Sequence, residues 1–116
     1  MKIAVSSQGG EVALHFGRCP EYTIFEVEDG KIAGKWTLPN PGHEPGFLPK
    51  FLGERGIACI IAGGMGPRAE ELFRQQGIEV VTGVAGPVDR VIQEYLDGRL
   101  ERGKSFCEHP GEPRCG

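Results

Sequence analysis

Residues 60–67 (IIAGGMGP) and residues 80–87 (VVTGVAGP) carry the same pattern at two places in the chain. Each begins with a short apolar run, typical of a buried strand, and continues into a Gly-x-x-Gly-Pro turn. Proline suits the first turn of a helix, because the N–H group that it lacks would have no intrahelical partner there. Apolar residues then recur at helical spacing over 67–76 and 87–97. The two stretches predict consecutive β-loop-α units, and hence an α/β fold.

Strands joined by such units lie parallel, with right-handed crossovers, so both glycine turns are expected at the same carboxyl edge of a sheet. Residues 2–7 predict a further strand with a polar exit at 6–10. The Asp-Gly turn at 29–30, between β-rich runs at 22–27 and 31–37, predicts an antiparallel hairpin. If the first strand is parallel to the two others, its exit and the start of the hairpin reach that same edge.

The remaining segments complete a single domain over residues 1–100. The spacing of apolar residues predicts a short helix over 47–54, and the prolines of 38–46 predict a surface loop. Residues 101–116 are charged and have no apolar period, so we expect a flexible tail there.

The composition excludes several classes of protein. A chain of 116 residues has room for one domain, and its formal net charge of -3 gives no electrostatic preference for nucleic acid or for an anionic membrane. No apolar stretch is long enough to cross a bilayer, and the chain does not open with a signal-peptide core, so we expect a cytoplasmic location. The four cysteines are then expected as free thiols or metal ligands. Without a Cys-x-x-Cys pair, they do not indicate a closed structural zinc site.

The turn Gly63-Gly64-Met65-Gly66 directly precedes a predicted helix start, where backbone amides and a partial positive charge favour an anion. Arg68 adds a formal charge beside it. The alternative is that these glycines only turn the chain from strand to helix. Nucleotide binding has little support, because the turn lacks the Lys-Ser/Thr pair of a P-loop. Met65 is either a thioether ligand or an ordinary hydrophobic residue.

A second group of candidate residues is His15-Phe16-Gly17-Arg18-Cys19. His15 and Cys19 offer a nitrogen and a sulfur ligand suited to iron, copper or molybdenum-sulfur species. Arg18 beside the thiol is expected to lower its pKa and so to favour the metal-binding thiolate. The alternative is that His15 is a partly buried loop residue without a ligand role.

The other cysteines have simpler interpretations. Cys59 lies within an apolar run and is predicted to be a core side chain. In the tail, Cys107, His109 and Cys115 offer three more ligands, which either capture or deliver a metal ion or are incidental on a solvated segment. The chain has no His-Glu-x-x-His motif and no evident Ser-His-Asp set, so a hydrolytic enzyme is not indicated.

Several of these segments together resemble a known family. They are the first strand with its Ser-Ser exit, the His-Phe-Gly-Arg segment at 15–18, the hairpin, the run IAGGMGPRA at 61–69 and the strand VTG at 81–83. In this order they are similar to the dinitrogenase iron-molybdenum cofactor-binding family, which includes NifX-like proteins and the carboxyl-terminal domain of NifB-like proteins.

The resemblance implies a ribonuclease H-like α/β domain with a mixed sheet of about five strands flanked by helices. It also implies a carrier, not a catalyst, that binds an iron-molybdenum-sulfur cluster, its precursor or another mixed-metal sulfide cluster. His15 heads the matching motif and is the expected cluster ligand, with Cys19 as a second. The expected partners are proteins that donate and accept the cluster, and the chain is expected as a monomer or weak homodimer.

Clusters of this kind are bulky anions, so a rim of backbone amides and arginines is expected to hold one with few side-chain ligands. The amides are those of Gly9, Gly10, Gly63, Gly64 and Gly66, and the arginines are Arg18 and Arg68. Two other hypotheses stay open. One is an enzyme that uses Cys19 as nucleophile and His15 as base, and the other is an interaction module whose tail binds zinc or nickel.

Overall fold

The computed structural model describes residues 1–16, 19–40 and 47–98. The elements within these residues are, in chain order, β1 (Lys2–Gln8), β2 (Glu11–Val12), β3 (Glu21–Glu28), β4 (Lys31–Pro39), α1 (Phe47–Glu54), β5 (Ile57–Ile61), α2 (Pro67–Gln75), β6 (Glu79–Val81) and α3 (Val88–Leu96). The strands form a six-stranded sheet in the order β4-β3-β1-β5-β6, with β2 paired to β1. The predicted mixed α/β sheet flanked by helices is confirmed, and the sequence analysis missed the short strand β2.

The strand directions follow from the connections. β1 is parallel to β5, and β5 is parallel to β6, as the β-loop-α units predict. β3 is antiparallel to both β1 and β4. The turn between β3 and β4 contains Asp29 with a φ of 53° and Gly30 with a φ of 76°, and positive φ at both positions is what a tight hairpin turn requires. The predicted hairpin is therefore confirmed.

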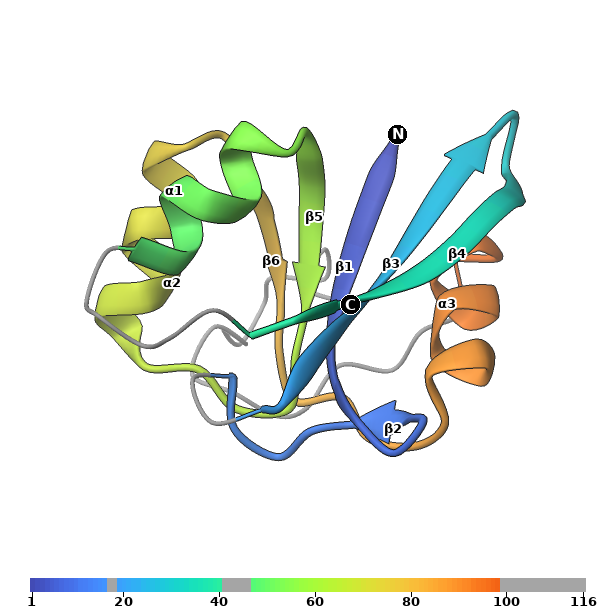
Figure 1. The fold of residues 1–116 in the computed structure, drawn as a ribbon, viewed down its shortest axis with the longest axis horizontal. Coiled ribbons are helices and arrows are strands. Elements are labelled where there is room, and N and C mark those ends of the chain that lie inside the picture. Colours follow the sequence, from blue (N-terminus) through green and yellow to red (C-terminus); the bar gives the residue numbers. More distant parts are fainter. Residues whose placement is uncertain (17–18, 41–46, 99–116) are drawn as a thin grey trace, which may run out of the picture.

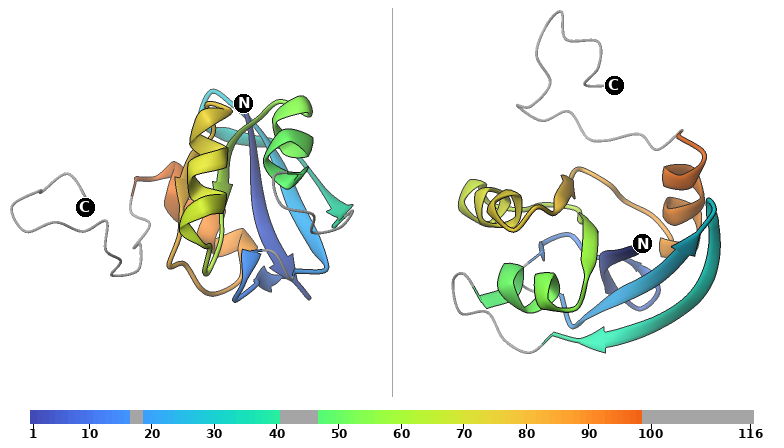
Figure 2. Two further views of the ribbon diagram at one scale, coloured as in Figure 1. Left: turned by 90° about the vertical axis from the view of Figure 1, so that its left-hand side faces the viewer. Right: turned by 90° about the horizontal axis from the view of Figure 1, so that it is seen from above.

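Helices cover both faces of the sheet (Figures 1 and 2): α1 and α2 lie on one face and α3 lies on the other. On the first face, Ala4 of β1 belongs to a buried cluster with side chains of α1 and α2. On the second face, Ile3 and Val5 pack with side chains of α3. Cys59 is fully buried on this second face, so its predicted place in the core is confirmed.

The helix α2 begins and ends as the sequence indicates. Gly66 is its N-cap, and Pro67 occupies the first helical position. After the last turn, Gly77 adopts a φ of 78°, and its N–H donates to the Arg74 carbonyl at 2.9 Å. The N–H of Ile78 donates to the Phe73 carbonyl at 3.0 Å, which completes the glycine-dependent helix end predicted here.

The end of β1 differs from the prediction. The strand continues to Gln8, so Ser6 and Ser7 lie inside the sheet and are fully buried, and the polar exit begins only after them. The two hydroxyls are satisfied internally: the Ser7 Oγ lies 2.8 Å from the Thr23 Oγ1, and the Ser6 Oγ donates to the Ile61 carbonyl at 3.5 Å. The alternation of apolar and polar residues along β1 did not reveal the burial of these serines, because their partners lie on strands that are distant in sequence.

Three predicted features lie wholly or partly outside the described residues. Most of the predicted surface loop, at 41–46, lies outside them, and the part at 38–39 belongs to β4. The predicted tail at 101–116 also lies outside, as does Arg18. Among the described helices, none has the length and apolar character that a membrane-crossing helix needs.

Candidate functional site

The carboxyl ends of β1, β5 and β6 lie at one edge of the sheet, because these neighbouring strands are parallel. The antiparallel strand β3 starts at the same edge, with Glu21 opposite Ser7. The loops that meet there form the lower edge of the molecule in Figure 1. The predicted convergence is confirmed, and we call this edge, formed by residues 9–16, 62–66 and 82–87, the rim.

Main-chain hydrogen bonds join the loops of the rim to one another. The Phe16 N–H donates to the Gly64 carbonyl at 2.8 Å, and the Gly63 N–H donates to the Ala13 carbonyl at 3.3 Å. The Gly83 N–H donates to the Gly63 carbonyl at 2.7 Å and ties the third loop to the second. Backbone pairing therefore fixes these loops relative to one another.

Gly63 and Gly64 lie where two backbone segments approach closely. A Cβ atom on Gly63 would lie 2.6 Å from the carbonyl oxygen of Ala13 and 2.9 Å from that of Leu14, and a Cβ on Gly64 would lie 3.1 Å from the Leu14 oxygen. Close approach is thus one reason for glycine here. The Gly63 N–H is already bonded to the Ala13 carbonyl, so this amide is not free to bind an anion. The expectation that Gly63 is one of the amides that hold an anionic cluster is therefore wrong.

Gly9 and Gly10 form the turn between β1 and β2, with φ values of 62° and 87°. This is again the geometry of a tight hairpin. The Gly10 carbonyl accepts a hydrogen bond from the Val88 N–H at 3.0 Å, and the Val12 N–H donates to the Gly86 carbonyl at 2.9 Å. The hairpin that the sequence analysis missed therefore holds the start of α3 against the rim.

His15 occupies an exposed position on the rim. It forms a short parallel bridge with Gly64, and a Cβ on Gly64 would lie 3.9 Å from the His15 Nδ1. The next residue, Phe16, is only 5% exposed. The centre of its ring lies 5.2 Å from the centre of the Phe73 ring and 5.8 Å from the centre of the Tyr22 ring. The buried ring anchors the backbone that presents the exposed imidazole, so the alternative of a partly buried histidine is wrong.

Cys19 is placed differently from the expectation. It is 3% exposed, and its Sγ donates to the Phe16 carbonyl at 3.3 Å. Burial raises the pKa of the Cys19 thiol above its ordinary value, so the expected lowering is wrong. A buried thiol that holds its proton is a poor nucleophile, and the structure therefore lends no support to an enzyme based on Cys19 and His15.

Two residues beside Cys19 were missed by the sequence analysis. The Asn40 Nδ2 donates to the Cys19 carbonyl at 2.8 Å and so links the end of β4 to this segment. Tyr22 is fully buried, and its hydroxyl makes no well-formed hydrogen bond among the described residues, although the Cys19 thiol lies beside it. Burial, and after it the neighbouring Cys19, raise the pKa of Tyr22. No sequence signal marks either residue, because both contacts depend on the packing of distant segments.

The start of α2 supplies the other predicted residues of the site. Arg68 is exposed in the first turn of the helix, and Gly66 is exposed at its N-cap. Met65 is partly buried and packs against the cluster under α1 and α2, which favours the hydrophobic alternative for this side chain. Arg68 therefore places a positive charge beside the rim.

Arg90 of α3 is a further cation, beside the rim, that the sequence analysis missed. Its Nη2 donates to the Ala85 carbonyl at 3.1 Å, and the guanidinium lies against Gly86, so a Cβ on Gly86 would displace it. Glu94 offsets part of this charge, with its carboxylate 3.8 Å from the Arg90 Nε. In the sequence, Arg90 and Glu94 lie four residues apart in a predicted helix, a spacing that favours an ion pair between them. This spacing does not indicate that Arg90 also contacts the loop at Ala85.

The described residues contain no group of three or more His, Cys, Asp or Glu side chains that could hold a metal ion. The rim itself offers the exposed His15, with Cys19 buried behind Phe16. The other predicted ligands, Cys107, His109 and Cys115, lie outside the described residues and stay predictions. What the structure brings together is one accessible imidazole, a helix start and exposed arginines.

The matches between this chain and known proteins include all residues of the rim. The family model described as dinitrogenase iron-molybdenum cofactor matches residues 1–98. The uncharacterised protein MJ0580 of Methanocaldococcus jannaschii is 33% identical over 107 residues, which cover 88% of this chain and 91% of that protein.

Solved structures show the same fold. The crystal structure of PH0822 has a TM-score of 0.85 and 30% sequence identity, and the match covers 94% of this chain and 100% of that chain. The apo form of the orange protein from Desulfovibrio gigas has a TM-score of 0.74 at 24% identity, over 87% of this chain and 91% of that chain. The second likeness shows a shared fold alone.

Proposed function

Because the chain belongs to the dinitrogenase iron-molybdenum cofactor family, we propose that it binds an iron-molybdenum-sulfur cluster, or a precursor of one, at the rim and carries it between proteins. The observation that carries this proposal is the exposed imidazole of His15, held on a backbone that pairs with Gly64. A neutral imidazole is a suitable ligand for iron and related metals. His15 is therefore the proposed side-chain ligand.

The charges around the rim support an anionic cargo. Gly64, Met65 and Gly66 lead into α2, and the start of a helix carries a partial positive charge. Arg68 adds a full charge in the first turn, and Arg90 lies by the loop that leads into α3. Glu11 is exposed on the rim as well and Glu70 lies in the first turn of α2, so the cations favour a negatively charged cluster at the start of α2 and do not make the whole edge positive.

A small number of ligands also supports a carrier. With one accessible imidazole among the described residues, the protein would hold its cargo loosely and release it readily to a protein with more ligands. Cys19 would become a second ligand only after its contact with Phe16 opens. The proposed partners are proteins that supply and receive the cluster.

Anaerobic reconstitution tests this proposal directly. The full chain, His15→Ala and Leu14→Ala would be incubated with iron, molybdate and sulfide, desalted, and measured by elemental analysis and visible absorption. Leu14 is a matched control, because it adjoins His15 and is 77% exposed but offers no ligand. We expect a sulfide-linked chromophore in the wild type and in Leu14→Ala, and a loss of bound metal of about tenfold or more in His15→Ala.

Two results would contradict the proposal. Equal metal content in folded His15→Ala and wild type would remove His15 as the ligand. The absence of any chromophore in the reconstituted wild type would contradict the carrier function itself.

A further inference from the structure

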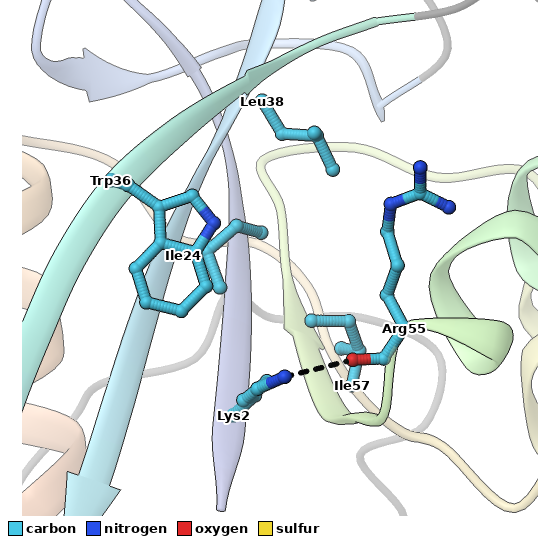
Figure 3. Close-up of a pocket in the computed structure, with 6 residues that line it drawn as sticks. All are labelled: Lys2, Ile24, Trp36, Leu38, Arg55 and Ile57. Atoms are coloured by element: carbon cyan, nitrogen blue, oxygen red, sulfur yellow. Dashed lines mark hydrogen bonds between the residues drawn. The ribbon is translucent and has the colours of Figure 1, made fainter.

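A hollow opens on the face of the sheet beside α1, away from the rim (Figure 3). Its lining residues are Lys2, Ile24, Trp36, Leu38, Arg55 and Ile57, and its empty volume, which includes open solvent, is about 270 Å³. Lys2 and Ile57 are the first residues of β1 and β5, whereas the rim lies at the carboxyl ends of these strands. The hollow is therefore separate from the proposed cargo site.

The walls of the hollow are mainly apolar. Trp36 of β4 stands opposite Ile24 of β3 in the strand register and is 43% exposed. Ile24 and Ile57, which are 2% and 5% exposed, form the floor between the indole and the side chain of Arg55. An indole that keeps this much exposed surface beside an aliphatic floor offers apolar area to an incoming side chain.

Two positive charges border this apolar surface. The Lys2 Nζ donates to the Arg55 carbonyl at 3.3 Å, and the Arg55 guanidinium lies 3.8 Å from the centre of the Phe51 ring. Both of these partners are neutral groups. Glu26, which lies opposite Lys2 on β3, pairs with the terminal amino group at 3.6 Å. The hollow is thus bordered by cations, although the chain as a whole has a net charge of -3.

The size of the hollow decides what kind of occupant fits. Pockets that enclose a drug-sized ligand measure roughly 300–1,000 Å³ and bury most of its surface. The space in the hollow that the centre of a water-sized molecule can occupy is about 60 Å³, far below that range, so the hollow suits a single apolar side chain from a protein surface, the way a central anchor residue is held in many interfaces. The bordering cations would then attract acidic residues next to that anchor.

We propose that this hollow docks a partner protein through an apolar anchor, phenylalanine or leucine, flanked by aspartate or glutamate. The anchor inserts between Trp36 and Arg55, and the acidic neighbours approach the Lys2 Nζ and the Arg55 guanidinium. No lining residue of the hollow belongs to the rim, and Lys2 and Ile57 lie at the opposite ends of β1 and β5 from it, so the docked anchor does not occupy the rim. The surface goes beyond cargo binding and does not depend on which cargo the rim takes.

The only tryptophan of the sequence lines the hollow, so its fluorescence reports binding there directly. Short acetylated peptides without tryptophan would be titrated into the full chain at low salt. One has a central phenylalanine between glutamates, and its control has lysines in place of the glutamates. We expect a saturable shift of Trp36 emission with the acidic peptide alone, weakened by added salt because exposed charges are screened.

Charge-reversal variants locate the binding. Arg55→Glu and Lys2→Glu are each expected to lower the affinity for the acidic peptide by about fivefold or more. Lys31→Glu, at the start of β4 and outside the hollow, is the matched control and should leave binding unchanged. Circular dichroism of each variant checks that the fold is retained, and two independent reversals keep the test informative if one of them fails to fold.

Several outcomes would overturn the proposal. They are no saturable response to the acidic peptide, equal binding of the lysine peptide, or unchanged binding by both folded reversal variants. A shift of Trp36 emission with protein concentration alone would show that a second copy of the chain occupies the hollow. Free phenylacetate binding as tightly as the acidic peptide would identify a small organic anion as the occupant.

Discussion

Gly63 stands so close to Ala13 that a Cβ on the glycine would lie 2.6 Å from the Ala13 carbonyl oxygen. The backbone of the loop after β5 therefore rests directly on the backbone that leads to His15. This contact makes the position of the proposed ligand depend on the absence of a side chain one loop away.

Replacement of Gly63 by alanine is expected to destabilise the protein by about 1–3 kcal/mol, because a backbone segment must shift to admit the methyl group. Gly66→Ala is the matched control in the same turn, since a Cβ there meets nothing within 4 Å and the φ of -70° suits alanine. Urea unfolding of both variants checks this. A Gly63→Ala variant as stable as Gly66→Ala would show that the two loops separate without cost.

Removal of the Tyr22 hydroxyl is expected to leave the free energy of unfolding unchanged or to raise it by up to about 1 kcal/mol, because a buried hydroxyl without a well-formed hydrogen bond costs desolvation. Thr23→Val is the comparison. It removes a group 2.8 Å from the Ser7 Oγ and should lower the stability by about 1 kcal/mol. Thermal or urea unfolding of Tyr22→Phe and Thr23→Val would measure both. A larger loss in Tyr22→Phe would mean that the hydroxyl does have a partner.

Stability is expected to fall as the pH rises above about 9, the ordinary pKa of a thiol. The folded protein raises the pKa of Cys19 and of Tyr22, in both cases mainly by burial. Below the ordinary values both groups are neutral in the folded and unfolded chains; above them only the unfolded chain ionises freely, and the folded state loses stability. The limiting slope is about 1.4 kcal/mol per pH unit for each group.

Unfolding in urea at a series of alkaline pH values would test this, with Tyr22→Phe as the variant. It should show a shallower decline than the wild type above pH 10, the ordinary pKa of tyrosine. Parallel declines for the two proteins would contradict the raised pKa of Tyr22.

The parts of the fold with strong local signals could be predicted from the sequence. Positive φ at Asp29 and Gly30 and the helix end at Gly77 follow from the residue types themselves. The repeated Gly-x-x-Gly-Pro pattern predicted parallel strands and, through them, the shared edge. Strand β2 gave no such signal, because it has two residues and exists only through its pairing with β1.

The side-chain chemistry of the site was harder to predict. The exposed position of His15 depends on its pairing with Gly64, and the burial of Cys19 depends on Phe16 and Tyr22 around it. A neighbouring arginine suggested a low pKa for the thiol, but desolvation dominates once the thiol is buried. The local sequence shows which charged residue is next to Cys19. Whether the thiol is buried depends on how distant segments pack in the core.

The hydrogen bonds that join the loops of the rim use backbone atoms, which every residue except proline supplies in full. Gly64, Gly83 and Gly86 meet their partners through backbone N–H and C=O groups, so the shape of this edge is inherited with the fold. Evolution is then free to exchange the outward-facing residues, within the steric limit at Gly63, without rebuilding the scaffold. Relatives with this fold can therefore present different side chains from the same backbone platform.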